Sequence, residues 1–279
     1  MQDLNLNYFR KKASSHHSNG LLNILLTIFD HLRENIKTNA EKNIKEYSLN
    51  SNLKLIKKQG YSIIPNFVNA KICADFQNEI DLIIKKHSEY LHKNIDDLRI
   101  YGAENLSSKI NSFSSNSYLR KIASAYNHTQ SYNAFSLAAK LPYMPNNKGS
   151  GGGWHRDSCI MQFKALLYLS DVTEKNGPFQ IIARSNNLKA KLFDNMRTNQ
   201  PYMGYRYTDN QVEEIIARDP NRLISFCEPA GTLILVDTSC IHRGKPIEEG
   251  IRYSLFNYYY PVEKITDALF NQFAPVARL

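Results

Sequence analysis

The stretch Trp154-His155-Arg156-Asp157-Ser158 places a histidine and an aspartate two residues apart, directly after the glycine-rich segment 149–153. In an extended chain, residues i and i+2 point to the same face. His155 and Asp157 can therefore present an imidazole nitrogen and a carboxylate oxygen to one point in space. Two such donors hold a metal ion weakly, so we expect a third donor from elsewhere in the chain.

The best candidate for the third donor is His242, which follows the apolar run 231–237, a predicted buried strand. Two histidines and one carboxylate on one face of the metal are the ligand set of non-haem Fe(II) oxygenases, and they leave about three coordination positions open. A 2-oxo acid bound through two atoms, together with O₂, would fill these positions. The residue types therefore predict an Fe(II) site at His155, Asp157 and His242.

The second carboxylate of such a cosubstrate also requires a cation. Arg252 lies in the strand-like run 251–260 that follows His242. Ser254 comes two residues later and is therefore expected to point to the same face of that strand. A guanidinium fork with a neighbouring hydroxyl suits a carboxylate. We therefore expect Arg252 and Ser254 to bind the cosubstrate.

The ordered set of His155-x-Asp157, His242 and Arg252 resembles the phytanoyl-CoA dioxygenase family of Fe(II)- and 2-oxoglutarate-dependent oxygenases. Two further segments are similar to that family: residues 168–179, which contain an Asn-Gly-Pro turn, and residues 60–67, which enter the core before a helix. The resemblance covers roughly residues 53–262. It departs at the segment Ile-Ala-Arg-Ser-Asn of residues 182–186, where the family usually has a segment like Pro-Gly-Ser-His and only the serine fits.

The resemblance implies that the protein uses Fe(II), 2-oxoglutarate and O₂, releases succinate and CO₂, and hydroxylates an unactivated C–H bond. Related halogenases have a small residue in place of the metal-binding carboxylate, so the presence of Asp157 favours hydroxylation. The substrate class stays open between a lipid, a sugar and a specialised metabolite. Two alternatives also stay open: a modifier of a cell-surface glycan or lipid at the inner membrane face, and a cupin-like binding protein without catalysis.

Strand-like runs and turns alternate from residue 135 to residue 260, which is typical of a double-stranded β-helix, the jelly-roll or cupin-like barrel of two sheets. Helical patterns precede these runs, so we expect a mainly β protein with flanking helices (α+β). Residues 1–52 are expected to form a mobile tail and an amphipathic helix, and residues 53–279 the oxygenase domain. Residues 185–224 interrupt the alternation of strand-like runs and turns, as expected of a lid-like insertion.

The alternating run 161–169 predicts a strand with two different faces. Its odd-numbered residues are all apolar, whereas the other face holds Gln162, Lys164, Leu166 and Tyr168. If this second face lines the barrel, Gln162, Lys164 and Tyr168 lie near the metal, and Lys164 can pair with a carboxylate of 2-oxoglutarate or with an anionic substrate. The alternative is a solvated face with an ordinary lysine. Leu166 stands where the family often has an aromatic contact to the cosubstrate.

Two local patterns complete the predicted elements. Residues 99–115 are polar and are expected to form a loop. Helical spacing predicts a helix over residues 70–92, capped by Asn69. The residues expected on its inner face are Ile72, Phe76, Ile80 and Ile83.

Residues 21–32 have an apolar stripe at helical spacing, within a helical pattern that extends to about residue 47. The stripe indicates either a helix docked on the core or peripheral contact with a membrane, the inner membrane in the alternative above. The sequence has no apolar run long enough to span a membrane and no signal-peptide pattern.

Charge and cysteine content limit the partners and the compartment. Lys and Arg exceed Asp and Glu by 35 − 26 = 9, which favours an anionic partner: nucleic acid, an anionic membrane surface, or an anionic small-molecule substrate. No basic run dominates, so we expect no nucleic-acid partner. The four cysteines show no CxxC spacing, and a cytoplasmic location with free thiols is the simplest expectation.

Overall fold

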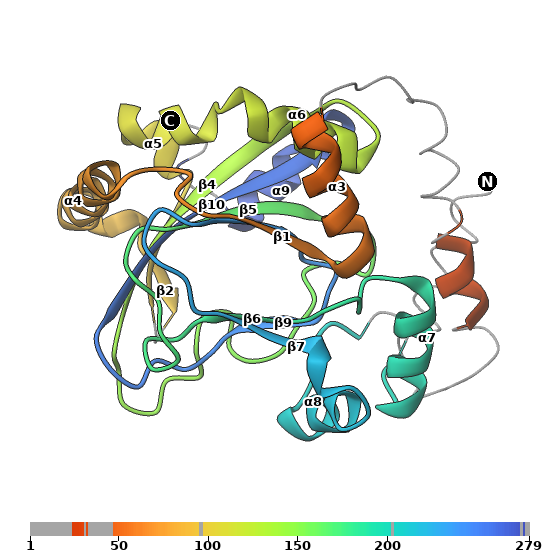
Figure 1. Cartoon of the computed structure of the whole chain (residues 1–279). Coiled ribbons are helices and arrows are strands. Elements are labelled where there is room, and N and C mark those ends of the chain that lie inside the picture. The colour runs from red at the N-terminus through yellow and green to blue at the C-terminus, as the bar shows by residue number, and fades with distance from the viewer. Residues whose placement is uncertain are drawn as a thin grey trace.

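The computed structural model describes residues 24–30, 32, 47–94, 97–201, 204–273 and 276. A large and a small antiparallel sheet face each other across the barrel (Figure 1). The large sheet has the strand order β1-β8-β5-β10-β4-β3-β2, and the small sheet has the order β7-β6-β9. The prediction of a mainly β, jelly-roll-like double-stranded β-helix with flanking helices is confirmed.

The strands are β1 (Tyr61–Ile64), β2 (His92–Asn94), β3 (Asp97–Tyr101), β4 (Ser131–Pro142), β5 (Phe163–Tyr168), β6 (Phe179–Ile182), β7 (Leu223–Phe226), β8 (Leu233–Asp237), β9 (His242–Gly244) and β10 (Ile251–Pro261). The α-helices are α3 (Tyr47–Gln59), α4 (Ala70–Lys86), α5 (Ser108–Ser114), α6 (Ser117–Asn127), α7 (Leu188–Arg197), α8 (Asp209–Ile216) and α9 (Asp267–Phe273). The 3₁₀ turns are η1 (Ser88–Tyr90), η2 (Ala103–Asn105), η3 (Pro220–Arg222) and η4 (Val262–Lys264).

The helices α3, α4, α5 and α6 cover the outer face of the large sheet (Figure 1). Their apolar side chains pack on that face in one core, which includes Ile80, Ile122 and Leu167. A second core lies between the two sheets and includes Leu166 and Ile181. The large sheet is therefore buried on both faces in its middle, where the strands are nearly continuous apolar runs.

The central strand β5 confirms the two-faced pattern predicted for residues 161–169. Phe163, Ala165 and Leu167 pack in the outer core below the helices. Leu166 and Tyr168 belong to the core between the sheets. The even-numbered face therefore points into the barrel, and the alternative of a solvated face is wrong.

Two local predictions are wrong. Residues 99–115 contain most of β3 and all of α5, because pairing of β3 with β4 gives this polar stretch a sheet partner that its composition does not reveal. The helix over residues 70–92 ends at Lys86. Asn69 caps it, since its side chain accepts a hydrogen bond from Ile72 N at 2.9 Å, but Ile72 itself is 40% exposed and Cys73 takes the buried position.

The insertion over residues 185–224 contains α7, α8 and η3 and continues into β7 of the small sheet. The predicted N-terminal helix lies partly outside the described residues: residues 24–30 and 32 are helical. Leu26 is buried there, whereas Leu25, Phe29 and Leu32 are about half exposed. The expected tail lies outside the described part of the chain, which begins at residue 24. Among the described helices, none has the length and apolar character needed to cross a bilayer.

Candidate metal centre

A short antiparallel backbone pairing brings the two histidines together. His155 N donates to His242 O at 2.9 Å, and His242 N donates to His155 O at 2.8 Å. The glycine-rich loop approaches one of them closely: Gly151 has a φ of +87°, and a Cβ at this position would lie 2.4 Å from His155 Cε1. Only glycine adopts this φ without strain and leaves room for the imidazole.

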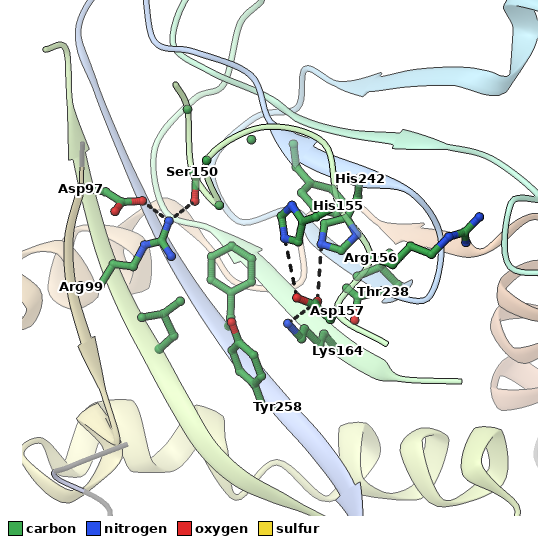
Figure 2. Close-up of a pocket in the computed structure, with 18 of the residues that line it drawn as sticks. Asp97, Arg99, Ser150, His155, Arg156, Asp157, Lys164, Thr238, His242 and Tyr258 are labelled. Carbon is green, nitrogen blue, oxygen red and sulfur yellow. Dashed lines mark hydrogen bonds and ion pairs between the residues drawn. The ribbon is translucent and has the colours of Figure 1, made fainter. Parts of the chain in front are cut away.

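The three predicted ligands converge. One donor atom from each of His155, Asp157 and His242 lies within 4.8 Å of the others. His155 Nε2 is 3.7 Å from Asp157 Oδ1, and His242 Nε2 is 3.4 Å from Asp157 Oδ2 (Figure 2). The Nδ1 atoms lie 2.8 Å from Gly153 O and 2.9 Å from Cys240 O. Because a carbonyl oxygen only accepts, each Nδ1 holds the proton and each Nε2 offers a lone pair.

The electrostatics keep His155 and Asp157 in the forms that bind metals. Burial, and then the neighbouring His242, lower the pKa of His155 to about 3, so this imidazole is neutral at pH 7. Removal from bulk solvent would by itself raise the pKa of Asp157, but the charge of Lys164 and the proximity of His242 outweigh that effect and hold its pKa well below the usual value. Asp157 is therefore an ionised carboxylate.

Of the cosubstrate residues predicted on β10 and at the end of β5, Arg252 lines the cavity that contains the triad, whereas Ser254 and Tyr168 do not. Arg252 lines the same cavity as the triad and is 2% exposed; its Nε and Nη1 have no hydrogen-bond partner. Ser254 Oγ is likewise buried without a partner. Tyr168 and Ser254 are not among the residues that line the cavity, and the Tyr168 hydroxyl accepts a hydrogen bond from Phe179 N at 2.9 Å.

Gln162 and Lys164 line the cavity beside the triad. Gln162 Nε2 donates to Tyr260 OH at 2.6 Å. Lys164 Nζ donates to Asp157 Oδ2 at 2.6 Å and lies 3.8 Å from the centre of the Tyr258 ring (Figure 2). The lysine ammonium thus contacts one of the predicted metal ligands.

The cavity has a volume of about 1130 Å³ and includes residues that the sequence reasoning missed. Arg99 pairs with Asp97 and donates to Ser150 Oγ at 2.8 Å, while its buried Nε has no partner (Figure 2). The period-two pattern of residues 97–101 was the available signal for this strand. Tyr205 and Arg206, from the segment 185–224 that is expected to form a lid, also line it. Further polar or aromatic lining residues that were missed include His92, Tyr101, Lys148, Tyr258 and Tyr260.

The sequence model of the phytanoyl-CoA dioxygenase (PhyH) family matches residues 56–250. The chain belongs to the phytanoyl-CoA dioxygenase family. Membership in this family confirms the predicted enzyme class, an iron- and 2-oxoglutarate-dependent oxygenase. A search of curated protein sequences gave no match.

Solved structures share the fold of this phytanoyl-CoA dioxygenase family member. The epimerase SnoN, in complex with Fe³⁺, alpha ketoglutarate and nogalamycin RO, is 12% identical with a TM-score of 0.59, over 77% of this chain and 84% of SnoN. EctD from S. alaskensis, with 2-oxoglutarate and 5-hydroxyectoine, is 17% identical with a TM-score of 0.60, over 81% and 80%. HygX from Streptomyces hygroscopicus, with nickel, 2-oxoglutarate and hygromycin B, is 14% identical with a TM-score of 0.52, over 76% and 87%.

Proposed function

We propose that this protein binds Fe(II) through His155, Asp157 and His242, binds 2-oxoglutarate through Arg252, and hydroxylates a small-molecule substrate. One observation carries the proposal. Three metal donors converge in a cavity that also contains a buried arginine with unpartnered guanidinium nitrogens. Each feature alone has structural explanations, but together they match the needs of a metal and an anionic cosubstrate.

The donor set suits iron. Two neutral imidazoles and one carboxylate are the facial ligand set of non-haem Fe(II) oxygenases. One donor atom of each residue lies within 4.8 Å of the others, which leaves room for a single ion between the three. The Nδ1 contacts of the two histidines to carbonyl oxygens fix both rings with Nε2 facing the site. SnoN and EctD, which share the fold, were crystallised with iron.

Arg252 suits the far carboxylate of 2-oxoglutarate. A buried guanidinium with unpartnered nitrogens is costly, and a carboxylate satisfies two of its N–H groups at once. Ser254 Oγ, also unpartnered, lies one period along the same strand face. We propose that both contact the cosubstrate and that Tyr168 supports the wall behind it. EctD and HygX were crystallised with 2-oxoglutarate.

The positions of residues along the inner face of β10 distinguish the two ends of the cavity. Arg252, Ser254, Phe256 and Tyr258 alternate along this face. Tyr258 pairs in register with Lys164, which contacts Asp157, so the metal donors lie toward Tyr258 and away from Arg252. We propose that 2-oxoglutarate occupies the Arg252 end and that substrate lies over Tyr258 and Tyr260.

The residues of this chain position the reactants and exclude water. When bound, Fe(II) and 2-oxoglutarate would supply the oxidising power, with O₂ consumed and succinate and CO₂ released. The triad fixes the metal at one face, and Arg252 fixes the distance of the cosubstrate from it. The apolar wall of Phe179, Val236 and Phe256 limits solvent in between.

The substrate is proposed to be an anionic small molecule. Lys148 and Arg206 lie in exposed positions on the cavity lining, where they favour a negatively charged ligand. Arg206 and Tyr205 come from the insertion over residues 185–224, and Arg206 Nη1 contacts Gly151 O. We propose that residues 53–279 form the oxygenase domain and that this insertion covers the site as a lid.

The test is succinate release from 2-oxoglutarate by the Fe(II)-loaded protein in air. We expect loss of release in His242→Ala and an increase in the KM for 2-oxoglutarate of at least about tenfold in Arg252→Ala, since truncating one partner of a buried charge pair costs roughly 2–5 kcal/mol. His87→Ala and Arg218→Ala, which change residues outside the cavity, are the matched controls. Wild-type release no greater than that of an iron-free sample would reject the proposal.

The half-exposed Leu25, Phe29 and Leu32 favour a second candidate, an enzyme that acts on a lipid or glycan at the inner membrane face. The measurement is co-sedimentation with vesicles of anionic lipid and with vesicles of neutral lipid. Binding to the anionic vesicles that is lost in a Leu25→Asp, Phe29→Asp variant would support it. Recovery of wild type and of the variant in equal amounts in the supernatant would reject it.

A further inference from the structure

Lys164 is an unusual residue to find beside a metal ligand. It lies on the central strand β5 and is 5% exposed. Its Nζ donates to Asp157 Oδ2 at 2.6 Å and lies 3.8 Å from the centre of the Tyr258 ring. A buried ammonium needs partners to offset its lost hydration. Here the carboxylate and the ring face of Tyr258 supply them.

We propose that Lys164 is a positioning residue that occupies one oxygen of Asp157, so that this carboxylate presents only its other oxygen to the metal. The inference rests on the function proposed above. It concerns how many coordination positions the protein leaves open, a property that the identity of the three ligands alone does not determine.

The number of open positions decides whether the proposed reaction can occur. With one atom from each ligand, a six-coordinate ion keeps about three positions, enough for a 2-oxo acid held by two atoms and for O₂. Carboxylates also bind metals through both oxygens. If Asp157 did so, about two positions would remain. The 2-oxo acid would fill both, and O₂ would have no place.

The sheet holds Lys164 in this role. β5 pairs with β10 on one side and with β8 on the other, where Lys164 aligns with Tyr258 and with Val236. The side chain therefore has a fixed origin on a strand with neighbours on both edges. Asp157 is held by a different contact, because its backbone N donates to Thr238 O, just after β8, at 3.0 Å. The contact between Nζ and Oδ2 thus joins two separately anchored segments.

The chain offers a matched control in Lys140 on β4. Lys140 Nζ donates to Asp81 Oδ1 at 2.8 Å and lies 5.2 Å from the centre of the Tyr253 ring. This is the same combination of lysine, aspartate and tyrosine, but none of the three residues lines the cavity. Lys140→Met therefore removes an equivalent ammonium without touching the metal centre.

The experiment uses nitric oxide as a probe of the O₂ position. Wild type, Lys164→Met and Lys140→Met are loaded with Fe(II) without air, with and without saturating 2-oxoglutarate. The electron paramagnetic resonance signal of the iron–nitrosyl adduct is then measured. Methionine keeps an unbranched apolar stem like that of lysine but has no terminal amine and cannot donate a hydrogen bond. Lys164→Arg, which keeps a cationic donor, covers the case in which Lys164→Met does not fold.

We expect wild type, Lys140→Met and Lys164→Arg to form the adduct with and without 2-oxoglutarate. Lys164→Met should form it without 2-oxoglutarate and lose most of the signal when 2-oxoglutarate is saturating. An equal signal in Lys164→Met and wild type would overturn the inference. So would an equal signal at saturation with a strongly raised Kd for 2-oxoglutarate, which would assign Lys164 to cosubstrate binding. If Lys164→Met does not fold, loss of the signal with 2-oxoglutarate in Lys164→Arg would overturn it. Absence of any adduct in wild type would reject the proposed metal site itself.

Discussion

Arg156 lies between the two proposed ligands His155 and Asp157 in the sequence, yet its guanidinium extends away from them (Figure 2). It is buried, with Nε donating to Tyr207 OH at 3.0 Å and Nη1 donating to Ser185 O at 2.8 Å. The alternation of an extended segment therefore directs His155 and Asp157 to the proposed metal site and Arg156 to an anchor in the insertion. A segment fixed in this way holds its donors before a metal arrives.

Gly151 gives a prediction at the residue scale. Gly151→Ala would place a Cβ 2.4 Å from His155 Cε1 and should displace that imidazole. We expect metal affinity to fall by about 10- to 100-fold, the range seen when a ligand loses its orientation. The measurement is Co(II) binding by isothermal titration calorimetry.

Gly152→Ala is the control for this prediction. Gly152 has a similar φ of +69°, and a Cβ there would meet only Arg206 Nη1, at an ordinary contact distance of 3.8 Å. It introduces the same kind of backbone strain in the same loop without displacing the ring. Equal Co(II) affinities for the two variants would show that strain, and not the contact with His155, determines the effect.

The candidate ligands could be predicted because the chemistry requires their residue types at a short, regular spacing. His155 and Asp157 share a face by the strand period, and His242 follows a recognisable buried strand. Arg99 could not be predicted in the same way. It reaches the cavity because β3 pairs with β4, a long-range contact that the polar composition of residues 99–115 conceals.

At the scale of elements, the turn after β8 presents His242. Asp237 ends this strand and organises the turn: its Oδ1 accepts from Ser239 N at 2.9 Å and its Oδ2 accepts from Tyr126 OH at 2.6 Å. Gln162 N also donates to Oδ1, at 3.1 Å. One buried carboxylate therefore connects α6, the start of β5 and the segment that leads to the second histidine.

Tyr126→Phe tests this connection. The change removes one hydrogen bond to a buried carboxylate and leaves the aromatic packing of Tyr126 in place. We expect the free energy of unfolding to fall by about 1.5–3 kcal/mol, the usual contribution of a hydrogen bond to a charged group. Urea unfolding measures it, with the half-exposed Tyr143→Phe as control. A midpoint unchanged from wild type would contradict the role given to this network.

The strands of the barrel were the most predictable elements. β5 has the predicted two faces, because burial of opposite faces in different cores imposes a period of two. The ends of helices were less predictable. In the predicted helix over residues 70–92, charged and apolar residues keep a helical spacing past Lys86. The chain nevertheless leaves the helix at His87 and forms η1.

At the scale of the whole molecule, the cavity is assembled from distant parts of the chain. It takes Arg99 from β3, Lys148 from the loop after β4, Arg206 from the insertion and Tyr258 from β10. No local pattern in the sequence relates these positions to one another. This is why the metal chemistry could be predicted from a few residues while the shape and charge of the substrate region could not.

Glu104 gives a prediction for the pH dependence of stability. Burial raises its pKa from 4.5 to about 7, although a hydrogen bond from Ser136 N opposes the shift. The folded protein therefore binds a proton more tightly than the unfolded chain does. This tighter binding of the proton adds up to about 3 kcal/mol to the free energy of unfolding. The contribution is fully present below pH 4.5 and is lost as the pH rises through about 7.

Glu104→Gln should remove this contribution. We expect the free energy of unfolding of wild type to fall more between pH 5 and pH 8 than that of the variant, as measured by urea unfolding at each pH. Other groups titrate in both proteins, so the difference between them isolates Glu104. Parallel pH profiles would contradict the raised pKa.

The central claim is that one cavity binds Fe(II) through the triad and 2-oxoglutarate through Arg252. Anaerobic titration of the Fe(II)-loaded protein with 2-oxoglutarate tests it most directly, because a 2-oxo acid on Fe(II) gives a weak visible charge-transfer band. We predict this band in wild type, its loss in His155→Ala, and its appearance only at much higher 2-oxoglutarate in Arg252→Ala. A folded wild type that gives no band would contradict the account.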